Sequence, residues 1–185
     1  MTRRWKGRWA LLAIGIVMLA AAGQEPAGYR MEAYRTETPS TLHGADVLTT
    51  EQAYDLWASR QAVFIDVLPR PPRPPDLPAS TLWRPKPRFD IPGSVWLPDT
   101  GYGALAPVME AYFERGLRQA SAGDHHRELV FYCLENCWMS WNAAKRAMAL
   151  GYTRVAWYRD GTDGWEAQGF PTEPREPEAQ PSATE

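Results

Sequence analysis

Residues 130–165 read VFYCLENCWMSWNAAKRAMALGYTRVAWYRDGTDGW and contain both cysteines of the 185-residue chain. The pattern predicts a short apolar strand, a tight turn with Cys133 and Cys137, an Ala-rich helix that ends at Gly151, and then a second strand and a Gly turn. Cys133 would lie at the carboxyl end of a strand, just before a helix start. Free backbone N–H groups and the positive end of the helix dipole meet there, and both favour the thiolate over the thiol. Cys133 is therefore a candidate nucleophile.

Strands and helices alternate along the rest of the chain. We expect strands at 45–48, 62–68 and 94–97, a helix that begins at Thr49 or Thr50, and a helix at 106–119. The apolar side of the 106–119 helix is expected to hold Val108, Tyr112 and Leu117. This alternation predicts an α/β fold with a single domain: an open parallel sheet with helices on both faces.

Several short motifs resemble those of the rhodanese-like (sulfurtransferase) domain, and they occur in the same order. They are Phe64-Ile65-Asp66-Val67, Ile91-Pro92-Gly93-Ser94-Val95, Tyr132-Cys133, Ala143-Ala144, Leu150-Gly151-Tyr152 and Gly164-Trp165, and the similarity spans about Asp46 to Pro171. Cys133-x-x-x-Cys137-Trp138 also resembles a subgroup named for its CXXCW motif. That subgroup is associated with periplasmic catabolism by PQQ-dependent dehydrogenases.

The resemblance implies that Cys133 is the nucleophile of sulfur transfer. The backbone amides of the following loop would then hold the charge of a persulfide; these belong to Leu134, Glu135, Asn136, Cys137 and Trp138. Met139 and Ser140 stand where phosphatases of the same fold carry an arginine, so phosphatase chemistry is not expected. Glu135 opposes ionisation of the thiol and repels anionic donors such as thiosulfate.

Cys137 lies four residues after Cys133, within reach of a disulfide bond if the turn brings the two Cβ atoms together. Such a small ring adds little stability through chain entropy and is typical of a reducible bond used in thiol–disulfide exchange or persulfide resolution. A permanent structural disulfide is the alternative, because two cysteines in an exported chain often form one.

The segment after Asp66 contains eight prolines between 69 and 87 and is expected to be a stiff insertion loop at 69–92. In an open parallel sheet this loop shares a rim with the cysteine loop, so its basic residues are placed to supply positive charge there; these are Arg70, Arg73, Arg84 and Arg88. A solvated insertion or a docking segment for another protein is equally consistent with the sequence. Trp138 and Trp141 are expected either in the core or, for Trp138, in the wall of a pocket for a planar ligand such as a quinone.

The amino-terminal residues are typical of a cleaved signal peptide. Four basic residues precede an uncharged run at 10–22, which is too short to span a membrane, and Ala20-x-Ala22 suits a signal peptidase. An uncleaved anchor is the alternative. We expect a signal peptide at 1–22, an arm at 23–44, the domain at 45–172 and a disordered tail at 173–185.

Cleavage would leave 16 basic against 22 acidic residues, a net charge of −6, which disfavours binding to nucleic acid or anionic membranes. The adjacent His125 and His126 have no third ligand in sequence, so no metal site is expected, and no cofactor is assigned.

Three functions follow from these observations. The first is an exported, periplasmic enzyme that uses Cys133, with Cys137 as partner, to transfer sulfur from a small sulfur or thiol substrate or to exchange disulfides. The second is a non-catalytic module that binds a periplasmic quinoprotein dehydrogenase or its cytochrome. The third is a factor that matures such a dehydrogenase by disulfide exchange. The sequence does not decide between them or show whether PQQ is bound.

Overall fold

The computed structural model describes residues 25–78 and 80–180, which contain a five-stranded parallel sheet at the centre of one domain. Its strands are β1 (Asp46–Leu48), β2 (Ala62–Asp66), β4 (Val95–Trp96), β5 (Glu128–Tyr132) and β6 (Val155–Tyr158), in the order β1-β6-β5-β2-β4. All four pairings within this sheet are parallel. The predicted α/β class is confirmed.

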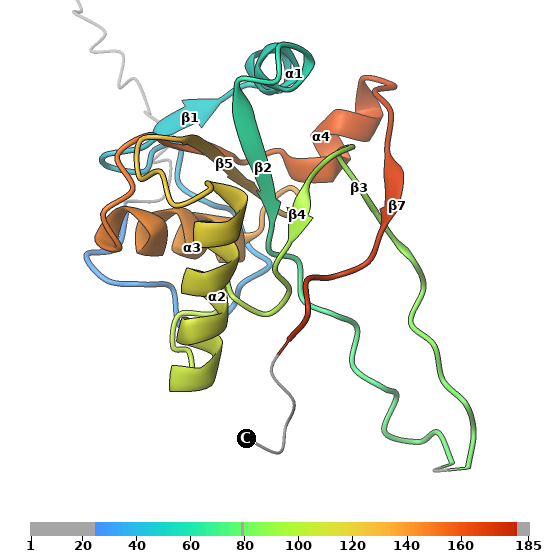
Figure 1. Ribbon diagram of the computed structural model, residues 1–185. Coiled ribbons are helices and arrows are strands. Elements are labelled where there is room, and N and C mark those ends of the chain that lie inside the picture. Colours follow the sequence, from blue (N-terminus) through green and yellow to red (C-terminus); the bar gives the residue numbers. More distant parts are fainter. Residues whose placement is uncertain (1–24, 79, 181–185) are drawn as a thin grey trace, which may run out of the picture.

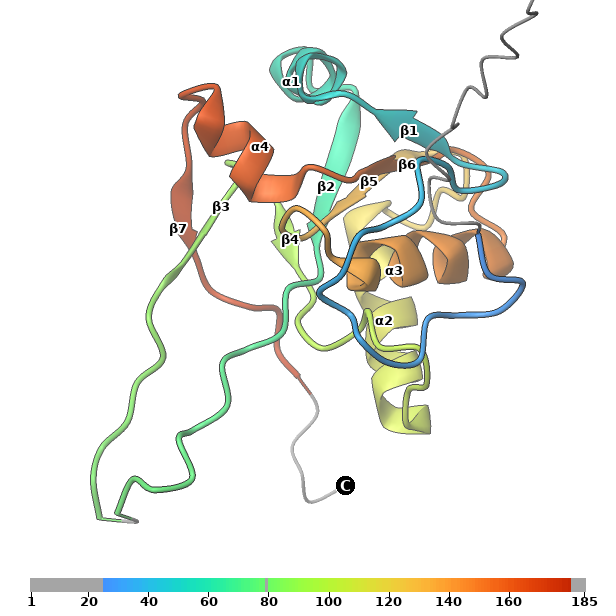
Figure 2. The same ribbon diagram turned by 180° about the vertical axis from the view of Figure 1, so that it is seen from behind.

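Four helices cover the two faces of the sheet (Figure 1). They are α1 (Thr50–Ala58), α2 (Pro107–Ala120), α3 (Trp138–Ala149) and α4 (Gly161–Ala167). Helices α2 and α3 lie on one face, and α1 and α4 lie on the other, as the reverse view also shows (Figure 2). The predicted open sheet with helices on both faces is therefore observed.

Alternation along the buried strands creates one core on each face. In β5, Leu129 and Phe131 face the core with α2 and α3, whereas Val130 and Tyr132 face the core with α1 and α4. Every residue of β5 and β6 is buried. Strand β5 thus lies in the middle of the sheet, and the cysteine loop that follows it begins deep inside the protein.

Helix α1 begins where its sequence predicts. The Thr49 hydroxyl accepts from the Gln52 backbone N–H, and the Gln52 side chain accepts from the Thr49 N–H, which together form a capping box. The expected apolar side of α2 is correct for Tyr112 and Leu117, but Val108, in the first turn of α2, is 43% exposed.

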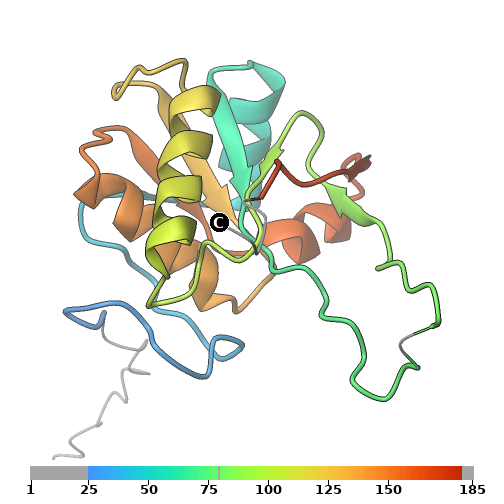
Figure 3. The ribbon, with the colours of Figure 1, turned by 60° about the horizontal axis from the view of Figure 1, so that its bottom comes forward.

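Two predictions about the carboxyl-terminal part are wrong. The expected Gly turn at 161–165 is the short helix α4. Residues 173–180, expected to be disordered, instead include strand β7 (Glu173–Arg175), which pairs antiparallel with β3 (Arg88–Asp90) at the end of the proline-rich loop. This pairing joins two segments that the sequence treats as unrelated, and the loop before β3 projects away from the body (Figure 3).

The predicted signal peptide at 1–22 lies outside the described residues. Among residues 25–78 and 80–180, no helix has the length and apolar character needed to cross a membrane.

Candidate functional site

The structure joins Cys133 and Cys137 in a disulfide bond between the end of β5 and the start of α3. Their Cα atoms lie 6.2 Å apart. Asn136 turns the loop back through a left-handed conformation, with φ of 53°, which an Asn side chain tolerates well. The two cysteines that the sequence singles out are therefore brought together.

Both cysteines are buried, with 0% of Cys133 and 1% of Cys137 exposed, and both belong to the core beside α2 and α3. A nucleophilic Cys133 would need an accessible sulfur, and in this oxidised form the residue is not accessible. Cys133 directly follows the central strand β5 and packs in the same core as Leu129 and Phe131, and an additional segment of the chain covers the loop.

That covering segment is the amino-terminal arm, residues 25–44. The Trp138 N–H, the first amide of α3, donates to the Tyr34 carbonyl at 2.9 Å. On the opposite side of the loop the Glu135 N–H donates to Asp163 Oδ2 at 3.0 Å. Two of the five amides expected to receive a persulfide are thus already occupied, and the expectation of a free set of donors is wrong.

The rest of the arm is held along α3 by two polar side chains, of which Asn142 is buried and Lys145 is partly exposed. Asn142, which is 0% exposed, accepts from the Arg30 N–H at 2.8 Å and donates to the Arg30 carbonyl at 2.9 Å. Lys145 Nζ donates to three arm carbonyls, those of Pro26, Ala27 and Gly28. The sequence pattern could suggest a peripheral arm but not these anchors, because Asn142 and Lys145 look like ordinary polar positions of a surface helix.

Both tryptophans of the motif are core residues. Trp138 is 5% exposed, and its indole N–H donates to Thr36 Oγ1 and to the Glu37 carbonyl. Trp141 is 0% exposed and donates to the Thr41 carbonyl at 3.2 Å. Of the two roles considered for Trp138, the contacts favour core packing beneath the arm over the wall of an open pocket.

Helix α4 lies against the cysteine loop from the other side. The Thr162 N–H and hydroxyl donate to the Cys133 carbonyl at 3.1 and 3.4 Å. Gly161 has φ of +55°, and a Cβ atom there would lie 2.5 Å from the Cys133 carbonyl oxygen. Only glycine allows this close approach. Thr162, Gly161 and Asp163 were not identified from the sequence as parts of the site, although they belong to the quoted Gly-rich stretch.

A buried charge cluster lies at the carboxyl end of β2, next to the loop. Arg88 Nε lies 2.8 Å from Asp66 Oδ2 and 2.9 Å from Asp90 Oδ1, and both carboxylates are 0% exposed. The Arg88 N–H is aimed at Asp66, so neither oxygen of Asp90 accepts a hydrogen bond within the described residues. Burial, followed by the charge of Asp66, raises the pKa of Asp90 to about 9. Asp90 therefore keeps its proton at neutral pH.

Arg88 also connects this cluster to the cysteine loop, because its Nη2 donates to Thr162 Oγ1 at 3.2 Å. The other arginines of the proline-rich loop do not reach the cysteines. Arg73 donates to the Pro78 and Thr81 carbonyls within that loop, while Arg70 and Arg84 line a separate cavity. Of the four arginines expected at the rim, Arg88 is the one that the described contacts connect to the cysteine loop, through Thr162, and Asp90 was missed although it precedes the quoted Ile-Pro-Gly turn.

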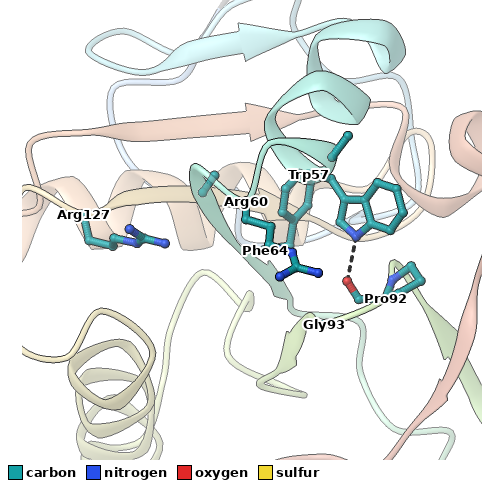
Figure 4. Close-up of a pocket in the computed structure, with 8 residues that line it drawn as sticks. Trp57, Arg60, Phe64, Pro92, Gly93 and Arg127 are labelled. Carbon is teal, nitrogen blue, oxygen red and sulfur yellow. Dashed lines mark hydrogen bonds between the residues drawn. The ribbon is translucent and has the colours of Figure 1, made fainter.

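The cavities of the described surface include four with volumes between 170 and 580 Å³, and neither cysteine lines any of these four; both cysteines are also buried. The 580 Å³ cavity lies at the amino end of β2, opposite to the cysteine loop, and is lined by Trp57, Arg60, Phe64 and Arg127 among others (Figure 4). The Trp57 indole donates to the Pro92 carbonyl there at 2.8 Å. Sulfur chemistry at Cys133 therefore requires the loop region to open.

Solved structures of sulfur-transfer proteins are similar to this chain in fold. The thiosulfate sulfurtransferase from Pseudomonas aeruginosa is 18% identical with a TM-score of 0.49, and the match covers 76% of this chain and 22% of that one. The polysulfide-sulfur transferase homodimer from Wolinella succinogenes is 17% identical with a TM-score of 0.45, covering 71% and 80%. An uncharacterized protein from Saccharomyces cerevisiae is 22% identical with a TM-score of 0.42, covering 68% and 93%.

A search of the curated proteins gave no match. The model of the rhodanese-like domain, in contrast, matches residues 49–168. This span begins at the cap of α1, includes the disulfide loop, and ends just after α4. The chain therefore belongs to the rhodanese-like domain family.

Proposed function

We propose that this chain is an exported rhodanese-like protein in which reduced Cys133 accepts a sulfur atom and Cys137 then resolves the persulfide to a disulfide. One observation carries the proposal: a second cysteine is bonded to the residue at the strand end where the family has its nucleophile. The disulfide is the resting form of the pair. Sulfur transfer occurs only after the pair has been reduced.

The chemistry balances with an organic persulfide as donor. The Cys133 thiolate attacks the outer sulfur of RS–SH, giving Cys133–S–SH and RS⁻. The Cys137 thiolate then attacks Cys133 Sγ, forms the disulfide and releases HS⁻. A dithiol reductant supplies the two electrons that restore both thiols. Glu135 is exposed and Asp163 holds the loop, so this acidic surface disfavours a dianionic donor such as thiosulfate.

The arm determines whether the loop can react. While Tyr34 accepts from the Trp138 amide, that amide cannot stabilise a persulfide. Reduction breaks the covalent link within the loop and allows the donors of residues 134–138 to turn toward Cys133. Sulfur transfer therefore needs both reduction of the disulfide and displacement of the arm from the Trp138 amide.

Export to the periplasm and a role beside PQQ-dependent alcohol catabolism are part of the same proposal. A disulfide bond supports an oxidising compartment, and the amino-terminal sequence supports a cleaved signal peptide. The Cys-x-x-x-Cys-Trp motif supports a periplasmic quinoprotein dehydrogenase, or its cytochrome, as the partner. PQQ itself has no assigned site on this chain.

Mass spectrometry of the peptide that contains Cys133 tests the sulfur-transfer step. Reduced Cys137→Ser protein treated with cysteine persulfide is expected to gain the mass of one sulfur atom on Cys133, because no resolving thiol remains. Cyanide should remove this sulfur as thiocyanate. Reduced Cys133→Ser protein is the matched control and should show no cyanide-labile sulfur on Cys137. Equal labelling of the two variants, or none in either, would reject the sulfur-transfer role.

The burial of both sulfurs supports a second function, that of a non-catalytic module that binds or matures a quinoprotein dehydrogenase. In that case the disulfide only stabilises the loop. A growth experiment distinguishes the two functions, in a host that needs this gene to grow on an alcohol. Undiminished growth with the Cys133→Ser/Cys137→Ser protein, folded and present at normal levels, would favour the module; lost growth favours the thiol chemistry.

A further inference from the structure

A basic cavity of about 360 Å³ lies at the carboxyl end of β2 and β4, and its lining residues come from the proline-rich loop, β3, β4 and the segment that includes β7. Five of its ten lining residues are basic and one is acidic; the basic ones are Arg70, Arg84, Lys86, Arg88 and Arg175. The proline-rich loop supplies Arg70, Arg84 and Lys86, β3 supplies Arg88, and β7 supplies Arg175. The β3–β7 pairing is what brings these segments together.

The positive charge of this basic cavity is only partly balanced. Arg88 is paired with Asp66, and Arg175 Nη2 lies 2.5 Å from Glu173 Oε1. Arg70 is close to Asp99. Burial raises the pKa of Asp99, and the charge of Arg70 offsets part of this increase. Arg84 and Lys86 have no carboxylate within 4.0 Å among the described residues. An excess of positive charge therefore remains at the mouth of the cavity.

Two buried groups beneath the cavity add to this excess. Burial, followed by the charge of Asp66, raises the pKa of Asp90, so this carboxyl group next to Arg88 contributes little negative charge to balance the cavity. The Nε atom of Arg175 is buried and donates to no acceptor within residues 25–78 and 80–180. A buried guanidinium nitrogen without an acceptor is costly, and the same side chain lines the cavity, so its charge is not fully compensated by the described residues.

The rest of the cavity wall is apolar. Trp96, whose indole donates to the Leu68 carbonyl at 2.7 Å, and three prolines, Pro85, Pro87 and Pro177, complete it. Basic groups beside an apolar wall are typical of sites for compact organic anions, and the volume lies in the range of small-molecule sites. The chain as a whole carries a net charge of −2, so the local positive potential is a specific feature of this cavity.

We propose that the basic cavity binds a small organic polyanion, that is, a compact molecule with two or more carboxylate or phosphate groups. The anionic groups pair with Arg84, Lys86 and Arg175, while the body of the molecule packs on Trp96 and the prolines. Arg88, in the same wall, donates to Thr162, which holds the Cys133 carbonyl, so the bound anion lies one side chain away from the support of the cysteine loop. This site is distinct from the sulfur-transfer position and does not depend on it.

Isothermal titration calorimetry with citrate and pyrophosphate as probes, at constant pH and ionic strength, tests this inference. Citrate represents carboxylate ligands and pyrophosphate represents phosphate ligands. At least one probe should bind at a single site much more tightly than acetate, and the tighter of the two identifies the ligand class. Each basic residue that is removed should weaken binding about tenfold, as expected for loss of a charged hydrogen bond.

The informative variants are Arg84→Gln and Lys86→Gln, because both side chains are exposed and neither makes a salt bridge in the described structure. Arg118→Gln, on the exposed side of α2 and away from the cavity, is the matched control. Weakening in both cavity variants but not in the control supports the site. Binding that is no tighter than that of acetate, or equal weakening in all three variants, would overturn it.

Discussion

Asp90 is the buried residue whose charge state most affects the carboxyl edge of the sheet. It lies beside Asp66 and Arg88 with no exposed surface, and two adjacent carboxylates cannot both ionise there at low cost. The sequence pointed to Asp66 through a family motif, but it did not reveal Asp90. Position 90 precedes the Ile-Pro-Gly turn by one residue, and only the folded chain places it opposite Asp66.

Asp90→Asn is expected to change the pH dependence of stability. The pKa of Asp90 rises from an ordinary 3.8 to about 9 on folding, so between these values folding takes up a proton. The stability contributed by this group is therefore complete below about pH 4 and is lost as the pH rises toward 9. Asparagine keeps a donor toward Asp66 and does not titrate.

Urea unfolding at pH 5 and pH 8 measures this effect. The free energy of unfolding of Asp90→Asn, relative to wild type, should increase from pH 5 to pH 8. Asp46→Asn, which alters an exposed carboxylate on β1, is the control and should leave the wild-type pH dependence unchanged. An Asp90→Asn difference that is the same at both pH values would contradict the raised pKa.

Arg146 is a second residue whose role the sequence did not indicate. Although it lies in α3, it is 8% exposed, donates to the carbonyls of Thr100, Tyr102 and Gly103, and stacks on the Tyr29 ring at 4.6 Å. Arg146→Met should lower the free energy of unfolding by about 2–4 kcal/mol, because three carbonyls lose a charged donor. Arg118→Met, an exposed change on α2, should lie within about 0.5 kcal/mol of wild type. A similarly small effect at Arg146 would show that water replaces its hydrogen bonds.

At the scale of elements, the alternation of strands and helices was readable from the sequence, whereas the packing of irregular segments was not. Helix α1 and strands β5 and β6 follow from capping residues and continuous apolar runs. The 161–167 helix was read as a turn because its two glycines are poor helix formers, and its support comes from contacts with the Cys133 carbonyl. Strand β7 depends on pairing with β3, a partner about eighty residues away.

The arm covers one side of the cysteine loop, and we expect it to restrict the access of reagents to the two thiols. Asn142→Ala removes both hydrogen bonds to Arg30 and one to the Gly101 carbonyl, and should detach the arm at that point. Limited proteolysis should then cleave within 26–41 faster than in wild type, while the body resists. Reduced Asn142→Ala should also react faster with a thiol-alkylating reagent than reduced wild type.

Asn142→Asp is the matched comparison, since it can still accept from the Arg30 N–H and should show an intermediate effect. If both variants retain wild-type cleavage and alkylation rates, the arm does not restrict access to the cysteine loop. The sequence could not predict this role, because the arm has no periodic pattern and its contacts are mostly through backbone carbonyls.

At the scale of the whole molecule, the fold is stabilised by two hydrophobic cores, one on each face of the sheet, and the disulfide adds only a local link. A ring of this size is expected to contribute about 2 kcal/mol through chain entropy. Reduced protein should therefore stay folded, with a free energy of unfolding about 2 kcal/mol below that of the oxidised form. Urea unfolding of the two forms checks this, and unfolding on reduction alone would identify the disulfide as an essential structural bond.

The fold class, the single domain and the closeness of the two cysteines in one loop could be inferred from local pattern and motif order. The covered state of the cysteine loop could not be inferred. It results from hydrogen bonds that the loop makes to Tyr34 and Asp163, which are each more than twenty residues away in sequence. The basic cavity was only partly visible as arginines among prolines, since Arg175 joins it through the β3–β7 pairing.

The most direct test of the account is the release of hydrosulfide when reduced wild-type protein meets one equivalent of cysteine persulfide. If Cys137 resolves a persulfide on Cys133, one hydrosulfide is released from each protein molecule, both thiols disappear, and the Cys133–Cys137 disulfide is recovered. A stable persulfide on wild-type Cys133, or two thiols that remain free with no hydrosulfide released, would contradict it.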